Sequence, residues 1–184
     1  FLWIATGAEG VKKYNQNFKS VAVDQTSENI REFAIGDYIK QILNSLSPKL
    51  KQAEVNVNYS HDFKIHSYPG ALARIISNLI ENSLIHGFED IENGIIDIDI
   101  RKEGDWVKIE YRDNGSGIPA DMIPLIFDPF FTTKRNLGGS GLGTHILYNL
   151  VTQTLKGRIK CIDTSMKGSC FKIDFPCKVH EEKD

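Results

Sequence analysis

The chain has 184 residues, 41% of them hydrophobic and 25% charged, which fits one globular domain with a short extension. Its net charge of −2 and pI of about 6.2 argue against a nucleic-acid-binding protein, which needs a basic surface. No apolar run approaches the roughly 20 residues that cross a bilayer. The cysteines lack metal-ligand spacing and are expected to be small buried residues in a reducing compartment: Cys161, Cys170 and Cys177.

The first predicted elements are a helix and a strand. Residues 1–30 are less regular, because Gly7 and Gly10 interrupt any helical pattern. Asp37 is a candidate N-cap for the helix. Its apolar side chains recur at helical spacing: Ile39, Ile42, Leu43, Leu46 and Leu50. Alternating apolar residues over 54–60 then predict a strand.

A second helix is predicted to begin at Pro69 and to end at Gly87. Phe63 and Ile65, just before it, indicate a short strand that partners 54–60. The buried stripe of the helix is predicted from residues at three- and four-residue spacing: Leu72, Ile75, Ile76, Leu79 and Ile80.

The second half of the chain predicts two pairs of strands around a third helix. Residues 96–100 and 107–112 alternate apolar and polar side chains, with a turn at 103–105. A long segment with glycine and proline, 114–143, separates them from a helix near 144–155. Two last strands are predicted at 158–163 and 169–176. This order predicts an α+β fold, a two-layer sandwich in which three helices cover one face of a mixed, mostly antiparallel sheet of about five strands.

Asn78, Asn82 and His86 lie four residues apart and so share one face of the second predicted helix. At about 100° per residue this row borders the apolar stripe, where amide groups need partners. Amide oxygens suit Mg²⁺ bound together with substrate phosphates. A solvated helix edge would explain the same residues.

Asp113 has the strand parity of Val107, Ile109 and Tyr111, and is therefore predicted to point inward. A buried carboxylate needs a hydrogen-bond donor, and a purine amino group could supply one. Gly115 and Gly117, which follow it, would let the backbone turn and a flat ring approach. An ordinary turn is the alternative.

Two further glycine-containing motifs follow. Residues 138–143 (GGSGLG) precede the third predicted helix and could cradle phosphate, with Lys134 nearby as a point charge, although a flexible loop is the alternative. Ser169 has the inward parity of the last strand, so its hydroxyl could join Asp113 around a base. It could also be a serine at a strand start.

The order of these motifs resembles that of sensor histidine kinase catalytic domains. Five segments resemble the N, G1, F and G2 boxes and the last glycine motif: 78–82 (NLIEN), 113–117 (DNGSG), 126–134 (IFDPFFTTK), 139–143 (GSGLG) and 168–171 (GSCF). The resemblance covers about residues 31–176 and implies the Bergerat fold. That fold is shared by gyrase-type ATPases, heat-shock chaperones, mismatch-repair ATPases and histidine kinases.

The resemblance implies an ATP site with Mg²⁺. Asn82 would coordinate Mg²⁺ with help from Asn78, and His86 would contact ribose or phosphate. Asp113 would accept the adenine amino group, Gly117 would lie against the ring, and Ser169 would reach the base through water. Other implied ATP-binding residues are Gly115, Ile118, Phe131, Thr133, Lys134, Gly139, Ser140, Gly141, Leu142 and Gly143, of which those from Lys134 onward belong to the ATP lid. The start of the lid would be anchored by Phe127, Phe130 and Phe131.

One position separates kinases from hydrolases within this fold. Gyrase-type hydrolases carry a glutamate base four residues before the magnesium asparagine, whereas this chain has Asn78 there. Transfer to another nucleophile is therefore favoured over hydrolysis. Asn78 and Glu81 are the catalytic candidates, with Glu81 as a possible assisting base. Ser83 and Thr144 stand where the family commonly has alanine and leucine.

The resemblance implies a kinase that phosphorylates a histidine of a dimerisation domain, in a homodimer that serves a response regulator. His61 is not a good candidate for that histidine, because it lies between predicted strands. Residues 1–30 are interpreted as a remnant or linker after a missing dimerisation domain, and residues 31–184 as the ATP-binding domain, cytoplasmic and monomeric. The alternatives are a serine-directed anti-sigma-type kinase and a non-catalytic nucleotide-binding module.

Overall fold

A computed structural model describes residues 21, 24, 29–51, 53–132, 141–165 and 167–179. A five-stranded sheet dominates it, with strands in the order β2-β4-β5-β7-β6. The strands are β2 (Ala53–Asn58), β4 (Gly94–Glu103), β5 (Trp106–Asp113), β6 (Arg158–Ile162) and β7 (Cys170–Pro176). β2 pairs with β4 in parallel, and the other neighbours are antiparallel. The predicted mixed, mostly antiparallel sheet is confirmed.

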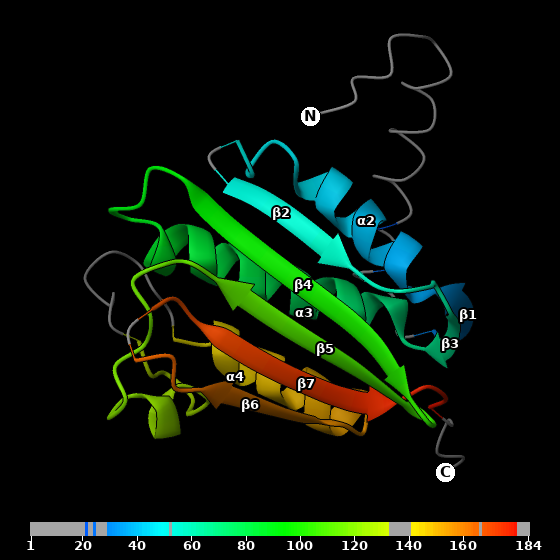
Figure 1. The fold of residues 1–184 in the computed structure, drawn as a ribbon. Coiled ribbons are helices and arrows are strands. Elements are labelled where there is room, and N and C mark those ends of the chain that lie inside the picture. Colours follow the sequence, from blue (N-terminus) through cyan, green and yellow to red (C-terminus); the bar gives the residue numbers. More distant parts are fainter. Residues whose placement is uncertain are drawn as a thin grey trace, which may run out of the picture.

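Three helices of the described residues cover one face of this sheet: α2 (Ile35–Leu46), α3 (Pro69–Asn82) and α4 (Gly143–Asn149) (Figure 1). A π-helical turn extends α3 as η1 (Ser83–Gly87) and another extends α4 as η4 (Leu150–Thr154), while η2 (Ile123–Leu125) is a short 3-10 helix. Ile98 and Ile109 of the sheet are fully or almost fully buried, as are Ile76 and Ile80 of α3. The helix stripe and the inward strand residues therefore form the core that their periodicities predict. None of the helices in the described part of the chain has the length and hydrophobicity of a membrane span.

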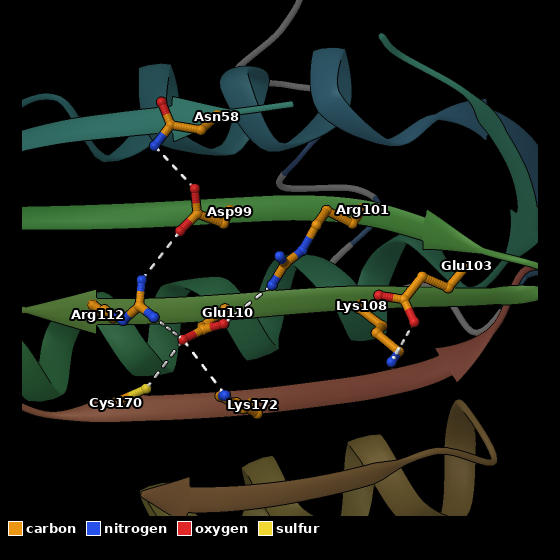
Figure 2. A network of polar contacts seen from close by, with 9 residues as sticks. All are labelled: Asn58, Asp99, Arg101, Glu103, Lys108, Glu110, Arg112, Cys170 and Lys172. Atoms are coloured by element: carbon orange, nitrogen blue, oxygen red, sulfur yellow. Dashed lines mark hydrogen bonds and ion pairs between the residues drawn. The ribbon is translucent and has the colours of Figure 1, made fainter. Parts of the chain in front are cut away.

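The opposite face of the sheet is covered by its own ion pairs (Figure 2). Glu110 on β5 is only 7% exposed, although strand alternation points it away from the core. Its carboxylate accepts hydrogen bonds from Arg101 and Arg112, and Lys172 Nζ lies 3.8 Å from it. The long stems of these basic side chains shield Glu110 from water.

One strand pairing was predicted wrongly. Strand β3 (Lys64–Ser67) does not partner β2 but pairs antiparallel with β1 (Arg31–Ala34), in a separate two-stranded sheet. Phe33 and Ile65 are opposite each other in this pair, and both are buried in the core. Alternation indicates which side of a strand is apolar but not which strand lies beside it, so the neighbour was not predictable from the pattern.

The cap of α2 also differs from the prediction. The helix begins at Ile35, and Asp37 lies inside its first turn rather than at the N-cap. The carboxylate of Asp62 takes the capping role: Oδ1 accepts the Gly36 N–H at 2.8 Å and Oδ2 accepts the Asp37 N–H at 3.0 Å. A side chain from the loop before β3 therefore satisfies amide groups at the start of α2.

We expect Asp62→Ala to lower the free energy of unfolding by about 1 kcal/mol, because two amide groups at the helix start lose their acceptor. Asp37→Ala is the matched control and should cost no more than about 0.5 kcal/mol, through loss of an acidic group in the first turn. Urea denaturation followed by circular dichroism measures both. A larger cost for Asp37→Ala than for Asp62→Ala would contradict this assignment of the cap.

The cysteines agree with the prediction at two of three positions. Cys170 and Cys177 are buried, whereas Cys161 on β6 is only half-buried, and all three are free thiols. Burial raises the pKa of Cys161 to about 11, so this thiol stays protonated at neutral pH. A protonated thiol is a poor nucleophile, which fits packing residues rather than reactive ones.

Candidate functional site

A cavity of about 420 Å³ opens between α3, the end of β5 and the start of α4. Its apolar wall consists of Leu79, Ile85, Ile118, Pro119, Met122, Ile126, Phe131 and Phe171. The predicted site residues that line it are Asn78, Glu81, Asn82, His86, Asp113, Gly117, Ile118, Phe131, Gly141, Gly143 and Ser169. An apolar cavity with a few convergent polar groups is the usual form of a small-molecule site.

Asn78, Asn82 and His86 form one half-buried row along this cavity, as their four-residue spacing predicts. Pro69 occupies the first turn of α3, which suits its fixed φ angle, and the apolar stripe then holds the helix on the sheet. The π-helical turn η1 continues the row to His86 and ends at Gly87. The local sequence therefore places two amides and an imidazole on the rim of the core.

The backbone at the start of α4 lies directly against these amides. A Cβ atom added to Gly143 would be 2.8 Å from Asn78 Oδ1 and 3.8 Å from Asn82 Oδ1. A side chain at this point would push against the Asn78 amide, whereas the distance to Asn82 Oδ1 is that of an ordinary contact. The first turn of α4 and the asparagine row are thus two sides of the same part of the cavity.

The Asn82 side chain has an unpaired donor. Its Nδ2 atom is buried and has no hydrogen-bond partner among the described residues. Such an atom costs free energy unless a ligand or water accepts from it. An amide oxygen that can bind Mg²⁺ and an amide nitrogen that lacks an acceptor suit a metal ion bound with a phosphate group.

Asp113, the last residue of β5, points into the cavity as its parity predicts and is 8% exposed. Its Oδ1 atom accepts the Gly115 N–H at 2.9 Å and the Ser169 N–H at 3.0 Å. Its Oδ2 atom accepts the Ser83 hydroxyl at 2.7 Å. Three donors from three segments therefore hold the carboxylate in one orientation.

Ser83 and Tyr111 are polar groups of the site to which sequence reasoning assigned no role. Both are buried, and the two hydroxyl oxygens lie 2.7 Å apart. Ser83 was noted only as a departure from the alanine common in the family. A signal was available, because Ser83 continues the apolar stripe of α3 at the spacing set by Leu79 and Ile80.

The segment before β7 packs directly against the backbone of Asp113. Gly168 has a φ of 76°, and a Cβ atom there would lie 1.7 Å from the backbone oxygen of Asp113. The backbones of Asp113 and Ser169 are also joined, with the Asp113 N–H donating to the Ser169 carbonyl at 3.1 Å. Ser169 contacts the carboxylate through its backbone N–H, whereas the sequence left open whether its hydroxyl would do so.

The loop after β5 and the segment before α4 complete the site. Gly117 has a φ of 79°, and Gly115 contributes its backbone N–H to Asp113 without lining the cavity. Leu142 is the N-cap residue of α4, and its carbonyl accepts the Ile146 N–H at 2.8 Å. Four predicted site residues lie outside the described residues: Thr133, Lys134, Gly139 and Ser140.

The three phenylalanines before α4 differ in their surroundings. Phe127 packs against Tyr148 and Phe171, with ring centroids 5.5 and 6.5 Å away, and Phe131 lines the cavity. Phe130 is 62% exposed, with a φ of 65°, and its backbone rather than its ring lies close to Gly141. Helical or strand periodicity does not apply in this irregular segment, and its side-chain directions could not be predicted.

Glu81 lies on the cavity rim and forms an ion pair that the sequence does not indicate. Lys49 Nζ, just after α2, is 2.6 Å from Glu81 Oε1, and both side chains are largely exposed. The Glu81 carboxylate therefore faces both the cavity and a nearby positive charge.

Known proteins resemble this chain in sequence. A family model described as "Histidine kinase-, DNA gyrase B-, and HSP90-like ATPase" matches residues 68–179, more than half of the chain. The chain is 29% identical over 168 residues to the sensor histidine kinase RcsC of Salmonella typhimurium, covering 87% of this chain and 17% of that protein. It is 44% identical over 81 residues to the sensor kinase CckA of Brucella abortus, covering 44% of this chain and 8% of that protein. The chain spans less than a fifth of these relatives.

Solved structures share the fold. The nucleotide-free catalytic domain of histidine kinase ThkA superposes with a TM-score of 0.71 at 24% identity, covering 82% of this chain and 97% of that one. Full-length ShkA in complex with AMPPNP has a TM-score of 0.69 at 20% identity, covering 91% of this chain and 36% of that one. ThkA in complex with the response regulator protein TrrA has a TM-score of 0.64 at 19% identity, covering 91% and 48%.

Proposed function

Because the chain belongs to the family of histidine kinase-, DNA gyrase B- and HSP90-like ATPases, we propose that it is the ATP-binding catalytic part of a two-component sensor histidine kinase. The cavity would bind ATP with Mg²⁺, and the domain would donate the γ-phosphoryl group to a histidine on a dimerisation domain. The observation that carries the proposal is one cavity with a buried carboxylate, Asp113, and an amide pair, Asn78 and Asn82.

The Asp113 side of the cavity is the proposed site of the adenine ring. The carboxylate accepts hydrogen bonds from all its described partners, so it would recognise a group with an N–H, such as the 6-amino group of adenine. The apolar wall, which includes Ile118 and Ile126, would cover the faces of the ring. Gly117, also on the wall, would lie against the ring, and Ser169 would contact the base through water.

The asparagine side of the cavity is the proposed site of the phosphates. Mg²⁺ held by the amide oxygens of Asn82 and Asn78 would neutralise phosphate charge during transfer. The unpaired Nδ2 of Asn82 would donate to a phosphate oxygen, and His86 would contact ribose or phosphate. Gly141 and Gly143, together with Lys134, Gly139, Ser140 and Leu142, would form the lid over the phosphates.

The identity of residue 78 favours transfer to a protein over hydrolysis. An amide at this position cannot take a proton from water, unlike the glutamate of gyrase-type hydrolases. Phosphoryl transfer depends mainly on positioning and charge stabilisation, which the row of Asn78 and Asn82 can provide. Glu81 is the carboxylate on the cavity rim that could assist the incoming nucleophile as a base.

Two measurements test the proposal. Calorimetric titration of the chain with ATP and Mg²⁺ should show saturable binding. A signal no larger than the heat of dilution would contradict the proposal. Incubation with ATP, Mg²⁺ and the dimerisation domain of the full-length kinase should then yield acid-labile, alkali-stable phosphate on that domain. Acid-stable phosphate would instead support a serine-directed kinase.

Glu81→Ala should reduce phosphoryl transfer by about 100-fold, within the usual range for a general base, and leave the affinity for ATP within about twofold. Transfer is measured with radiolabelled ATP, and affinity by calorimetry. Lys49→Ala is the matched control, because it removes the same ion pair but keeps the carboxylate. Unchanged transfer in Glu81→Ala, or an equal loss in Lys49→Ala, would show that the carboxylate is not the base.

The proposed partners follow from the proposed reaction. The phosphohistidine would pass its phosphoryl group to the receiver domain of a response regulator, and the dimerisation domain would make the full protein a homodimer. The domain would then act in the cytoplasm, where ATP is present.

A further inference from the structure

Two buried hydroxyl groups form a chain to the Asp113 carboxylate. Ser83 is 3% exposed and borders the cavity, whereas Tyr111 is fully buried in the core of the domain. Ser83 Oγ lies 2.7 Å from Tyr111 Oη and 2.7 Å from Asp113 Oδ2. Alanine and phenylalanine could fill most of the same volume without polar atoms to satisfy. The hydroxyls therefore add interactions that packing alone does not require.

The hydrogen-bond chain has one direction. Ser83 donates its single hydroxyl proton to Asp113 Oδ2. Ser83 then has only lone pairs for Tyr111, which must be the donor. Burial raises the pKa of the Tyr111 phenol, so it keeps its proton at neutral pH. The order is Tyr111 to Ser83 to Asp113, and each donated bond polarises the next.

The Asp113 carboxylate can accept one more hydrogen bond. Oδ1 already accepts the N–H groups of Gly115 and Ser169, and Oδ2 accepts only Ser83 among the described residues. A carboxylate oxygen accepts about two hydrogen bonds. The remaining acceptor position is therefore on Oδ2, the atom that Ser83 orients, in a residue that lines the cavity.

We propose that Tyr111 and Ser83 are a positioning pair that aims Asp113 Oδ2 at the exocyclic amino group of a purine and thereby sets the preference of the cavity for 6-aminopurine nucleotides. This inference rests on the proposed nucleotide site. Both hydroxyls act through Asp113 in this scheme, because Ser83 donates its one proton to Oδ2 and Tyr111 does not line the cavity. Removing either should reduce discrimination at position 6 of the purine rather than nucleotide binding in general.

The test compares ADP with purine riboside 5′-diphosphate, which lacks the 6-amino group, by calorimetry with Mg²⁺. The wild-type chain should prefer ADP by about 10- to 100-fold, the range for a hydrogen bond to a charged group. Ser83→Ala should lower this preference to about threefold or less, while the affinity for the analogue changes by less than about twofold. Tyr111→Phe should lie between, and the double variant should match Ser83→Ala, because Tyr111 acts only through Ser83.

If Ser83→Ala weakens the binding of ADP and of the analogue equally, the pair has only a structural role. If the wild-type chain binds ADP and the analogue with equal affinity, Oδ2 does not recognise the amino group and the proposal is wrong. A wild-type chain that binds neither would instead remove the proposed nucleotide site. Thermal unfolding checks each variant, and Tyr111→Phe, which keeps the ring, gives the same test if Ser83→Ala does not fold.

Discussion

Asp113→Asn should weaken ADP binding by about 100-fold, or about 2.7 kcal/mol. The substitution keeps the size of the side chain but replaces one acceptor oxygen with a donor NH₂ group. If the NH₂ group takes the Oδ1 position, it faces two backbone N–H donors. If it takes the Oδ2 position, Ser83 can turn to accept from it, but the acceptor proposed for the adenine amino group is gone.

Calorimetry with ADP and Mg²⁺ measures this loss, and circular dichroism shows whether the variant is folded. Asp121→Asn is the matched control, because it removes the same charge from an exposed residue that does not line the cavity. Its affinity for ADP should stay within about twofold of wild type, since an exposed charge is screened. A folded Asp113→Asn variant with normal ADP affinity would refute the assignment of the adenine side.

Gly168→Ala should lower the free energy of unfolding by about 3 kcal/mol or more. The new Cβ atom would lie 1.7 Å from the backbone oxygen of Asp113, so one of the two segments must move. The φ of 76° adds conformational strain for any residue with a Cβ atom. Because the moving segment carries Asp113 and Ser169, ADP affinity should fall as well.

The matched control for this variant is Gly104→Ala, in the turn between β4 and β5. Gly104 has a φ of 59°, but a Cβ atom there would have no atom of the described residues within 4 Å, so only the backbone strain remains. Its cost should be about 1 kcal/mol, with ADP affinity unchanged. Guanidinium denaturation measures both variants. If both variants lose the same free energy of unfolding, the clash between the new Cβ atom and Asp113 is relieved at no measurable cost.

Much of the site was predictable because its side-chain directions follow from local geometry. Strand alternation from Val107 to Asp113 placed the carboxylate inward, and the four-residue spacing of Asn78 and Asn82 placed both amides on one cavity wall. Periodicity of this kind depends only on the backbone conformation of one element. The side-chain directions within one element can therefore be predicted without knowing which elements lie beside it.

Features that depend on contacts between elements were not predictable in the same way. The cap of α2 comes from Asp62, which is 26 residues from the Gly36 amide it binds, and Asp37 only has the right type and position for a cap. The partner of β3 is β1, although β2 has an equally suitable pattern. More than one residue could cap the helix and more than one strand could pair with β3, and the packing of the core determines which one does.

The sequence by itself determined the five-stranded, three-helix layout and the inward direction of Asp113, because hydrophobic periodicity and residue type are local properties. Only the tertiary structure decided how that carboxylate is held. It brought Ser83 from η1, the Gly115 amide from the loop after β5, and the Ser169 amide from the segment before β7 to the same two oxygen atoms. A hydrogen-bond partner is chosen by distance and direction in space, and neither is encoded in the spacing along the chain.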